Sequence, residues 1–385
     1  MAAISKTKRT LITVAVAAAF GGSLFVALRG QQADLKQERQ AQQEAAELAA
    51  LQPLQGLIAL DVEPFFKDPR VIQRLAAARL PVSVSRVGSR DMAAKLDGAG
   101  RSGAPDFFFP SGVVAANQVV DAARKANLPV AQLAPFHTPM VIASWEPVAR
   151  ILVANGLAKP LSPKVYGLDM AALTQLMLAK KKWKELKDAG AYEVSRSVLV
   201  STTDLRRSNS GAMYLALTSQ ALNGDVVTDR PTARATALKL AELFKRQGYQ
   251  ENYVNGNFDD YVAIGMGKTP LAFIYENQLV SHALAKQGVS ADMVLLYPQP
   301  TIVNKVVFVS LNERAKALGE LLANDAELQG IAVEYGFRIA DTARFVKTVQ
   351  ATGLGVEPRL TQVVDPPSFE LMAEMIEVVA QEMAQ

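Results

Sequence analysis

From Gly56 onward, short apolar runs alternate with segments of helical spacing, and this alternation limits the possible folds more than any other feature of the sequence. A short apolar run between turn residues is typical of a buried strand, and apolar residues three and four apart are typical of a helix. Their regular alternation predicts an α/β fold, with parallel strands and helices on the faces of the sheet. We expect strands at 57–60, 82–84, 107–109, 139–145, 197–200, 271–275 and 306–311, and helices at 71–78, 113–126, 173–186, 212–222 and 368–383. The last of these helices is amphipathic, and we expect it to pack on the first domain.

The N-terminal segment differs from the rest of the chain. Three basic residues precede an uncharged apolar run at residues 11–28, close to the roughly 20 residues that a helix needs to cross a bilayer. Cleavage near Ala19 would leave a very short apolar core, and Phe25 disfavours cleavage after Ala27. We therefore expect residues 1–30 to form an uncleaved signal anchor, with cleavage as the alternative. The basic residues before the span orient the body of the protein to the periplasmic side of the inner membrane.

Residues 31–55 are expected to form a helical stalk. The segment is rich in Ala, Gln, Glu and Leu and has no proline before Pro53. Its apolar positions do not keep a heptad, since Leu35 is followed one heptad later by Gln42. A coiled-coil dimer is therefore only a secondary interpretation.

The composition excludes several classes of site. The chain of 385 residues has no cysteine, which excludes disulfides, thiolate metal sites and a cysteine nucleophile, and it has only two histidines, His137 and His282. The formal charge is +4 and is spread along the chain, except for the lysines around Trp183, which we expect on the solvated face of a helix. We expect no nucleic-acid partner, no cofactor, no metal and, without a catalytic motif, no enzymatic activity.

Polar turns follow four of the predicted strands. In open parallel sheets, ligands bind at the carboxyl ends of the strands, where these turns lie. The turns are at 61–63, 88–90, 110–112 and 201–210, and each one alone could be an ordinary turn with capping residues. In the last turn, Ser208, Asn209 or Ser210 could cap the following helix, or a bound anion could take that role.

Several short sequence words occur in a characteristic order along most of the chain. They are "EPFFKDPRV" (63–71), "VGSRDM" (87–92), "FFFPSG" (107–112), "TPMVIASWEPVARIL" (138–152), "DLRRSNSGAMYLAL" (204–217), "PLAFIYENQLVS" (270–281), "LLYPQPTIVN" (295–304) and "VEYGFR" (333–338). Their order resembles the type II periplasmic solute-binding proteins. More closely, it resembles the bacterial extracellular solute-binding family that also occurs beside von Willebrand type A domains.

The resemblance implies two lobes that close around one small polar or anionic solute. Two crossover segments, near 138–145 and 297–308, would join lobe one (56–142 and 300–385) to lobe two (143–299). The resemblance further implies a set of ligand-binding residues on the two lobes. They are Ser89, Arg90 and Ser111 on lobe one, and Arg206, Arg207, Ser208, Asn209, Ser210 and Tyr275 on lobe two.

The first strand exit departs from the pattern of the family. Relatives tend to have a small or hydroxyl residue where this chain has Leu60, Asp61 and Val62. The two apolar side chains cannot hydrogen-bond an oxyanion, and Asp61 would repel one. Two interpretations therefore stay open. The first is a membrane-tethered solute-binding or solute-sensing protein working with a membrane transporter or envelope complex, and the second is a non-binding envelope scaffold on the same fold that recruits protein partners.

We predict that residues 11–28 remain in the mature protein as one spanning helix, because the run has the length of a span and a poor cleavage site. Carbonate extraction of membranes followed by N-terminal sequencing tests this. The full chain should stay in the membrane fraction, and a soluble product that begins after residue 19 would contradict the prediction.

Overall fold

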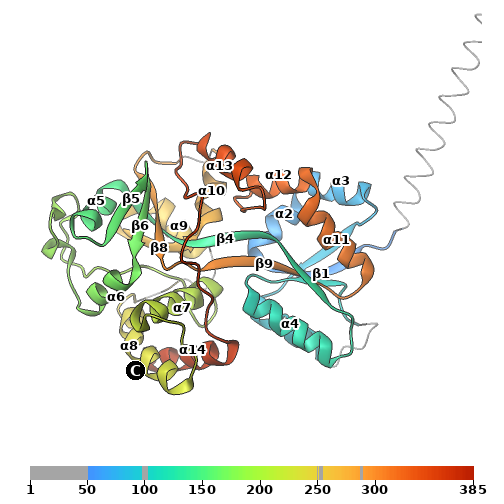
Figure 1. Cartoon of the computed structure of the whole chain (residues 1–385), viewed down its shortest axis with the longest axis horizontal. Coiled ribbons are helices and arrows are strands. Elements are labelled where there is room, and N and C mark those ends of the chain that lie inside the picture. Colours follow the sequence, from blue (N-terminus) through green and yellow to red (C-terminus); the bar gives the residue numbers. More distant parts are fainter. Residues whose placement is uncertain (1–50, 98–102, 249, 251–254, 287–288) are drawn as a thin grey trace, which may run out of the picture. The chain divides into compact units, whose positions relative to one another are not determined.

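The computed structural model describes residues 51–97, 103–248, 250, 255–286 and 289–385. The expected anchor and residues 31–50 of the expected stalk lie outside this part of the chain. Among the described residues, no helix has both the length and the apolar character needed to cross a membrane. The chain divides into two compact units, residues 1–53 with 76–81 and residues 54–75 with 82–385. The second unit contains all the strands described (Figure 1).

Nine strands form one continuous sheet. Their order is β2-β1-β3-β9-β4-β8-β6-β5, and β7 also pairs with β4. β1 runs parallel to β2 and β3, and β6 runs parallel to β8, while the other pairs are antiparallel. The α/β fold is confirmed, but the sheet is mixed and not purely parallel. The strands are β1 (Leu54–Ile58), β2 (Val82–Arg86), β3 (Phe107–Phe109), β4 (Ala131–Trp145), β5 (Ala158–Ser162), β6 (Val165–Asp169), β7 (Leu271–Tyr275), β8 (Met293–Gln299) and β9 (Val303–Ser310).

Strand β4 changes its partners half-way along its length. Its residues up to Pro139 pair with β9, and its residues from Met140 onward pair with β7 and β8. We call β1, β2, β3 and β9 the first half-sheet, and β5 to β8 the second half-sheet. Since β8 ends at Gln299 and β9 begins at Val303, both predicted crossover segments contain a point where the chain passes between the half-sheets. Figure 1 shows β4 and β9 running side by side.

The three phenylalanines of β3 show how the first half-sheet is filled. Alternate side chains of a strand point to opposite faces. Phe107 and Phe109 contact the rings of Phe66 and Phe308, and the Phe107 and Phe308 ring centroids are 4.8 Å apart. Phe108 instead joins the apolar core formed with α4. The three phenylalanines therefore pack on both faces of the sheet, and this packing holds the end of β3 from which the polar turn continues.

The helices cover both half-sheets, and several begin with a side-chain cap. Asp229 accepts a hydrogen bond from the amide of Thr232 at the start of α8, and Ser368 accepts one from Leu371 at the start of α14. The helices are α2 (Glu63–Lys67), α3 (Pro69–Ala77), α4 (Val113–Lys125), α5 (Glu146–Ala154), α6 (Met170–Leu178), α7 (Asn209–Asn223), α8 (Arg230–Lys245), α9 (Gly256–Ala263), α10 (Glu276–Leu284), α11 (Glu313–Asn324), α12 (Ala326–Glu334), α13 (Thr342–Gln350) and α14 (Phe369–Met383).

Three predicted elements differ from the structure. β1 begins at Leu54, inside the expected stalk, and ends at Ile58. The predicted helix at 173–186 ends at Leu178 because Lys180 has a left-handed backbone, with φ of +57°, and the following lysines lie in a turn around the buried Trp183. The predicted strand at 197–200 is an extended segment with single bridges at its ends, from Ser197 to Lys182 and from Ser201 to Ala272.

The prediction that the C-terminal helix packs on the first domain is wrong. α14 packs on α8 and α7, beside the second half-sheet (Figure 1). Its buried Met375 and Val379 join the core of that half, and Glu374 forms an ion pair with Arg234 at 3.1 Å. The chain reaches this position by running past the second crossover, where the amide of Thr301 donates to the carbonyl of Gln362 and the amide of Val364 donates back to Thr301.

A buried ion pair lies close to the crossovers. Arg338 donates to both carboxylate oxygens of Glu276, at 2.6 and 2.7 Å, and the hydroxyl of Tyr297 donates to the same carboxylate. Glu276 is fully buried, and Arg338 is 3% exposed. The pair joins the start of α10 to β8 and to the segment after α12.

We predict that Glu276→Ala lowers the free energy of unfolding by about 3–5 kcal/mol, because it leaves the Arg338 charge buried without its partner. Urea denaturation followed by circular dichroism measures the loss. Arg150→Ala is the matched control, since Arg150 and Glu146 form an ion pair in which the arginine is 76% exposed, and its loss should cost at most about 1 kcal/mol. Equal losses for the two variants would contradict the prediction.

Candidate functional site

Polar side chains gather where four strands end. Asp61 follows β1, Ser89 and Arg90 follow β2, and Ser111 follows β3, all in the first half-sheet. Across from them lie Tyr275, the last residue of β7, and Asn209, the first residue of α7. Because β1 lies between two parallel strands, the carboxyl ends of these three strands share one edge. We call Asp61, Ser89, Arg90, Ser111, Asn209, Tyr275 and Asn304 the polar cluster.

Hydrogen bonds tie together the turns of the first half-sheet. The amide of Ser111 donates to Ser89 Oγ at 3.0 Å, and the hydroxyl of Ser111 donates to Asp61 Oδ1. The amide of Gly112 donates to the carbonyl of Lys305 at 3.1 Å, which places the third turn against β9. The three turns therefore form one connected surface.

Arg90 connects this surface to the other side of the cluster, where Asn209 and Tyr275 contact each other. Arg90 donates from its two terminal nitrogens to the carbonyls of Arg206 and Leu205, each at 3.3 Å. Asn209 Nδ2 donates to the hydroxyl of Tyr275 at 2.9 Å. Arg90 thus joins the exit of β2 to the turn that leads into α7.

Gly112 lies where two asparagines approach the third turn. Its φ is +92°, a conformation that favours glycine. A Cβ at this position would lie 3.2 Å from Asn304 Oδ1 and 3.7 Å from Asn209 Nδ2. The glycine therefore leaves room for both amide side chains.

Three buried polar atoms of the cluster have no hydrogen-bond partner among the described residues. They are Asp61 Oδ2 and both side-chain atoms of Asn304, Oδ1 and Nδ2. Leaving such an atom unpaired costs roughly 1–3 kcal/mol, so these positions call for a bound polar group. The sequence pattern did not indicate Asn304 as a site residue, because it lies in a predicted crossover segment. It ends the word "LLYPQPTIVN".

Burial governs the ionisation of the cluster. It raises the pKa of Asp61, and the hydrogen bonds from Ser111 and nearby amides offset this only in part. Burial also lowers the pKa of Arg90 below its usual value, and the nearby Tyr275 and Asp91 offset this only in part. A raised pKa favours the neutral carboxyl of Asp61, which can donate a hydrogen bond to an anion. The repulsion expected from the sequence is weakened accordingly.

The structure places Ser208 and Ser210 in a separate group of hydroxyls. The Thr203 hydroxyl lies 2.8 Å from Ser208 Oγ and 2.6 Å from Ser210 Oγ, and all three side chains are buried. Ser208 is the N-cap residue of α7, but its side chain makes no capping bond, so the capping interpretation is wrong for this residue. The turn is tightly packed, since a Cβ at Gly211 would lie 2.4 Å from the carbonyl oxygen of Thr203.

Among the described residues, the side chains of the two neighbouring arginines make no hydrogen bond or ion pair with the cluster side chains. Arg206 forms an ion pair with the buried Asp204, and its Nε lies 2.9 Å from Asp204 Oδ1. Arg207 is exposed. Of the nine predicted ligand-binding residues, the structure thus brings together Ser89, Arg90, Ser111, Asn209 and Tyr275, and a ligand contact by the other four stays a prediction.

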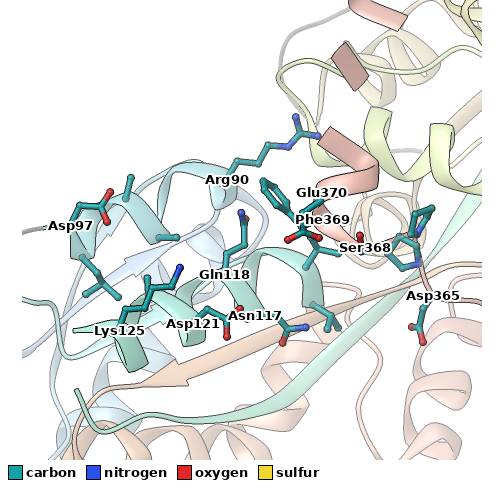
Figure 2. Close-up of a pocket in the computed structure, with 18 of the residues that line it drawn as sticks. Arg90, Asp97, Asn117, Gln118, Asp121, Lys125, Asp365, Ser368, Phe369 and Glu370 are labelled. Carbon is teal, nitrogen blue, oxygen red and sulfur yellow. The ribbon is translucent and has the colours of Figure 1, made fainter. Parts of the chain in front are cut away.

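Two hollows adjoin the polar cluster. We call the first the inner cavity, with a volume of about 260 Å³ between α4, α7 and α14, and Ser89, Arg90 and Asn209 are among its lining residues. The second, the outer groove, has a volume of about 1080 Å³ and runs along α4. Arg90, Val114, Gln118 and Phe369 line both. Figure 2 shows Arg90 extending across the outer groove toward the start of α14, near Phe369.

Acidic and histidine side chains do not gather into a metal site in the part of the chain that the structure describes. No group of three or more such residues there could hold a metal ion. The polar cluster contains one cationic side chain, that of Arg90, and one carboxyl group, that of Asp61. The arrangement therefore suits a small polar or anionic ligand held by hydrogen bonds.

Comparison with known proteins bears on the fold. No protein-family model matches the sequence, and no curated protein matches it. The structure is similar to the substrate-binding protein of an ABC transporter from Agrobacterium tumefaciens, with 15% identity over 87% of this chain and 95% of that one, at a TM-score of 0.50. An ABC transporter protein from Clostridium perfringens has 13% identity over 86% and 98% of the two chains, at the same TM-score.

The fold is similar to that of the substrate-binding protein of an ABC transporter. This confirms the two-lobed α/β fold of the periplasmic-binding type that the order of the sequence words implies. The finer resemblance to the family found beside von Willebrand type A domains is not shown by these similarities. At such low identities the likeness concerns the fold alone.

We predict that Asp61→Asn stabilises the protein relative to wild type increasingly as the pH rises. The raised pKa means that the folded protein holds a proton that the unfolded chain has released. Wild-type stability therefore falls as the pH rises from the usual value of 3.8 through the raised pKa, and is level above it. The variant lacks this loss. Urea denaturation over a pH series measures the difference.

Asp204→Asn is the control of opposite sign. Burial raises the pKa of Asp204, but the hydrogen bonds and charge of Arg206 outweigh it and leave the pKa lowered. The wild type therefore gains stability from this group as the pH rises to 3.8, and Asp204→Asn loses that gain. Parallel pH profiles for the two variants would contradict the assignment.

Proposed function

We propose that the protein is an extracytoplasmic solute-binding or solute-sensing protein, tethered to the inner membrane through residues 11–28. Its polar cluster binds one small polar or anionic solute between the two half-sheets. The observation that carries the proposal is the set of unpartnered buried atoms, Asp61 Oδ2 and the amide of Asn304, at the carboxyl ends of the strands. The shared fold supports it, because this is the usual ligand position in open α/β sheets.

The cluster offers complementary groups from both sides. Arg90 has five N–H donors and uses two of them on backbone carbonyls at long distance, which leaves donors for an oxyanion. The Asn304 amide offers a further donor, and its side-chain atoms have no partner among the described residues. Asn209 and Tyr275 approach from the other half and complete the enclosure.

The same contacts indicate how a ligand would draw the two half-sheets together. Arg90 belongs to the first half-sheet and contacts the turn before α7, which belongs to the second. A ligand that pairs with Arg90 and Asn209 together would favour the arrangement in which both are close, because ligands shift conformations only by differential affinity. The protein would then pass its solute, or report its presence, to a membrane transporter or an envelope complex.

We predict that a small anionic or polar solute raises the melting temperature of the full-length protein. A screen in detergent would cover sulfate, phosphate, molybdate, carboxylates, amino acids and sugars. A ligand at a hundredfold excess over its Kd adds about 2.7 kcal/mol of stability, which is easily detected. Stabilisation by none of these solutes would contradict the proposal and favour the non-binding scaffold.

Arginine variants make the test specific. Arg90→Gln should weaken an anionic ligand by about 1.5–3 kcal/mol, the range for a hydrogen bond to a charged group. Arg150→Gln is the matched control, because Arg150 is 76% exposed and lies outside the polar cluster. Calorimetric titration of both variants should separate them, and equal affinities would remove Arg90 from the binding site.

A further inference from the structure

The inner cavity is lined by both polar and apolar side chains. The polar ones are Ser89, Arg90 and Asn209 of the polar cluster, together with Gln118 and Glu377. The rest of the wall comes from apolar side chains of three helices. These are Val114 and Ala115 of α4, Ala212 and Met213 of α7, and Phe369, Met372, Ala373 and Ile376 of α14.

The C-terminal helix supplies most of the apolar wall. α14 is fixed on α8 by the ion pairs of Glu374 with Arg230 and Arg234. α4 belongs to the first half-sheet and faces α14 across the cavity. The cavity is therefore bounded from both half-sheets, as the polar cluster is.

We propose that the inner cavity binds the apolar part of the solute, and that the solute is a small monocarboxylate whose carboxylate lies at Arg90. This inference rests on the proposed function and names its ligand class. A cavity of roughly 150 Å³ already holds benzene, so about 260 Å³ accommodates an aromatic ring or a chain of about six carbons.

The charges at the cavity fit one carboxylate and no more. Arg90 is the cation among the lining residues, and its planar guanidinium pairs with a carboxylate through two parallel hydrogen bonds. Glu377 is the acidic lining residue and is exposed at the rim. A second carboxylate on the far end of the ligand would meet its negative charge, which disfavours dicarboxylates.

The outer groove gives a route to the inner cavity. The two hollows share Arg90, Val114, Gln118 and Phe369, so a ligand can pass along α4 and reach Arg90 before its tail is buried. Phe369 is 39% exposed at this boundary, between the groove and the cavity. Figure 2 shows its ring beside the arginine at the start of α14.

The test is a series of monocarboxylates of increasing length, titrated calorimetrically into the full-length protein in lipid nanodiscs. The probes are acetate, butanoate and hexanoate, with hexan-1-ol as the uncharged counterpart of the longest acid. Each buried methylene should tighten binding about fourfold, so hexanoate, with four more methylenes, should bind roughly 250-fold more tightly than acetate. Hexan-1-ol should bind far more weakly than hexanoate, because its neutral hydroxyl cannot form the charged pair of two hydrogen bonds with Arg90.

Ala373→Phe fills the inner cavity from α14, and we expect it to weaken hexanoate roughly tenfold or more while acetate changes less than about twofold. Val114→Phe fills it from α4 and serves if the first variant unfolds. Ala380→Phe is the matched control, since Ala380 is two turns further along α14 and does not line the cavity. Urea midpoints confirm that each variant is folded.

The outcomes separate this inference from the proposed function. Equal binding of acetate and hexanoate, or an unchanged hexanoate affinity in Ala373→Phe, would overturn the apolar subsite and leave solute binding intact. Hexan-1-ol binding as tightly as hexanoate would overturn carboxylate recognition. If neither acid binds while another solute in the screen stabilises the protein, the ligand class is wrong, and stabilisation by no solute at all would refute the proposed function itself.

Discussion

The buried ion pair of Glu276 with Arg338 connects chain segments from both sides of the crossovers. Removing two charges from water is expensive, and only several well-placed hydrogen bonds offset that cost. Here Glu276 receives two from Arg338 and one from Tyr297, and Arg338 also donates to the carbonyl of Glu357 at 2.6 Å. Chain segments from both sides of the crossovers supply these groups, so the pair forms only when both sides are in place.

This ion pair also fixes part of the binding site. Glu276 directly follows Tyr275, the residue whose hydroxyl accepts from Asn209. The backbone of Arg338 pairs with that of His137 on β4, two residues before β4 changes partners after Pro139. Burial and the nearby Arg338 charge lower the pKa of His137 to about 4, so the imidazole is neutral and adds no second charge there. One electrostatic unit therefore positions both the crossover and one wall of the polar cluster.

The polar cluster and the inner cavity together describe a divided site. The turns after β1, β2 and β3 supply hydrogen-bonding groups, and α14 supplies an apolar wall beside them. α14 reaches this place because the chain runs past Thr301 at the second crossover and then packs on α8. The last segment of the chain thus passes between the half-sheets as well, and it shapes the site far from its neighbours in sequence.

The sequence by itself determined the α/β alternation and the polar turns at the strand ends, because these depend on local spacing. The neighbourhood of both crossovers was implied only by the resemblance of the sequence words to a known family. Arg90 and Ser111 stand in or beside these turns, and Tyr275 was implied by the same resemblance. The sequence could not place α14, since an amphipathic stripe shows that a helix packs but not against what. It could not show the role of Asn304, which depends on the approach of β9 to Gly112, nor the raised pKa of Asp61, which depends on burial. These features arise from contacts between segments distant in sequence, and only the tertiary structure decides them.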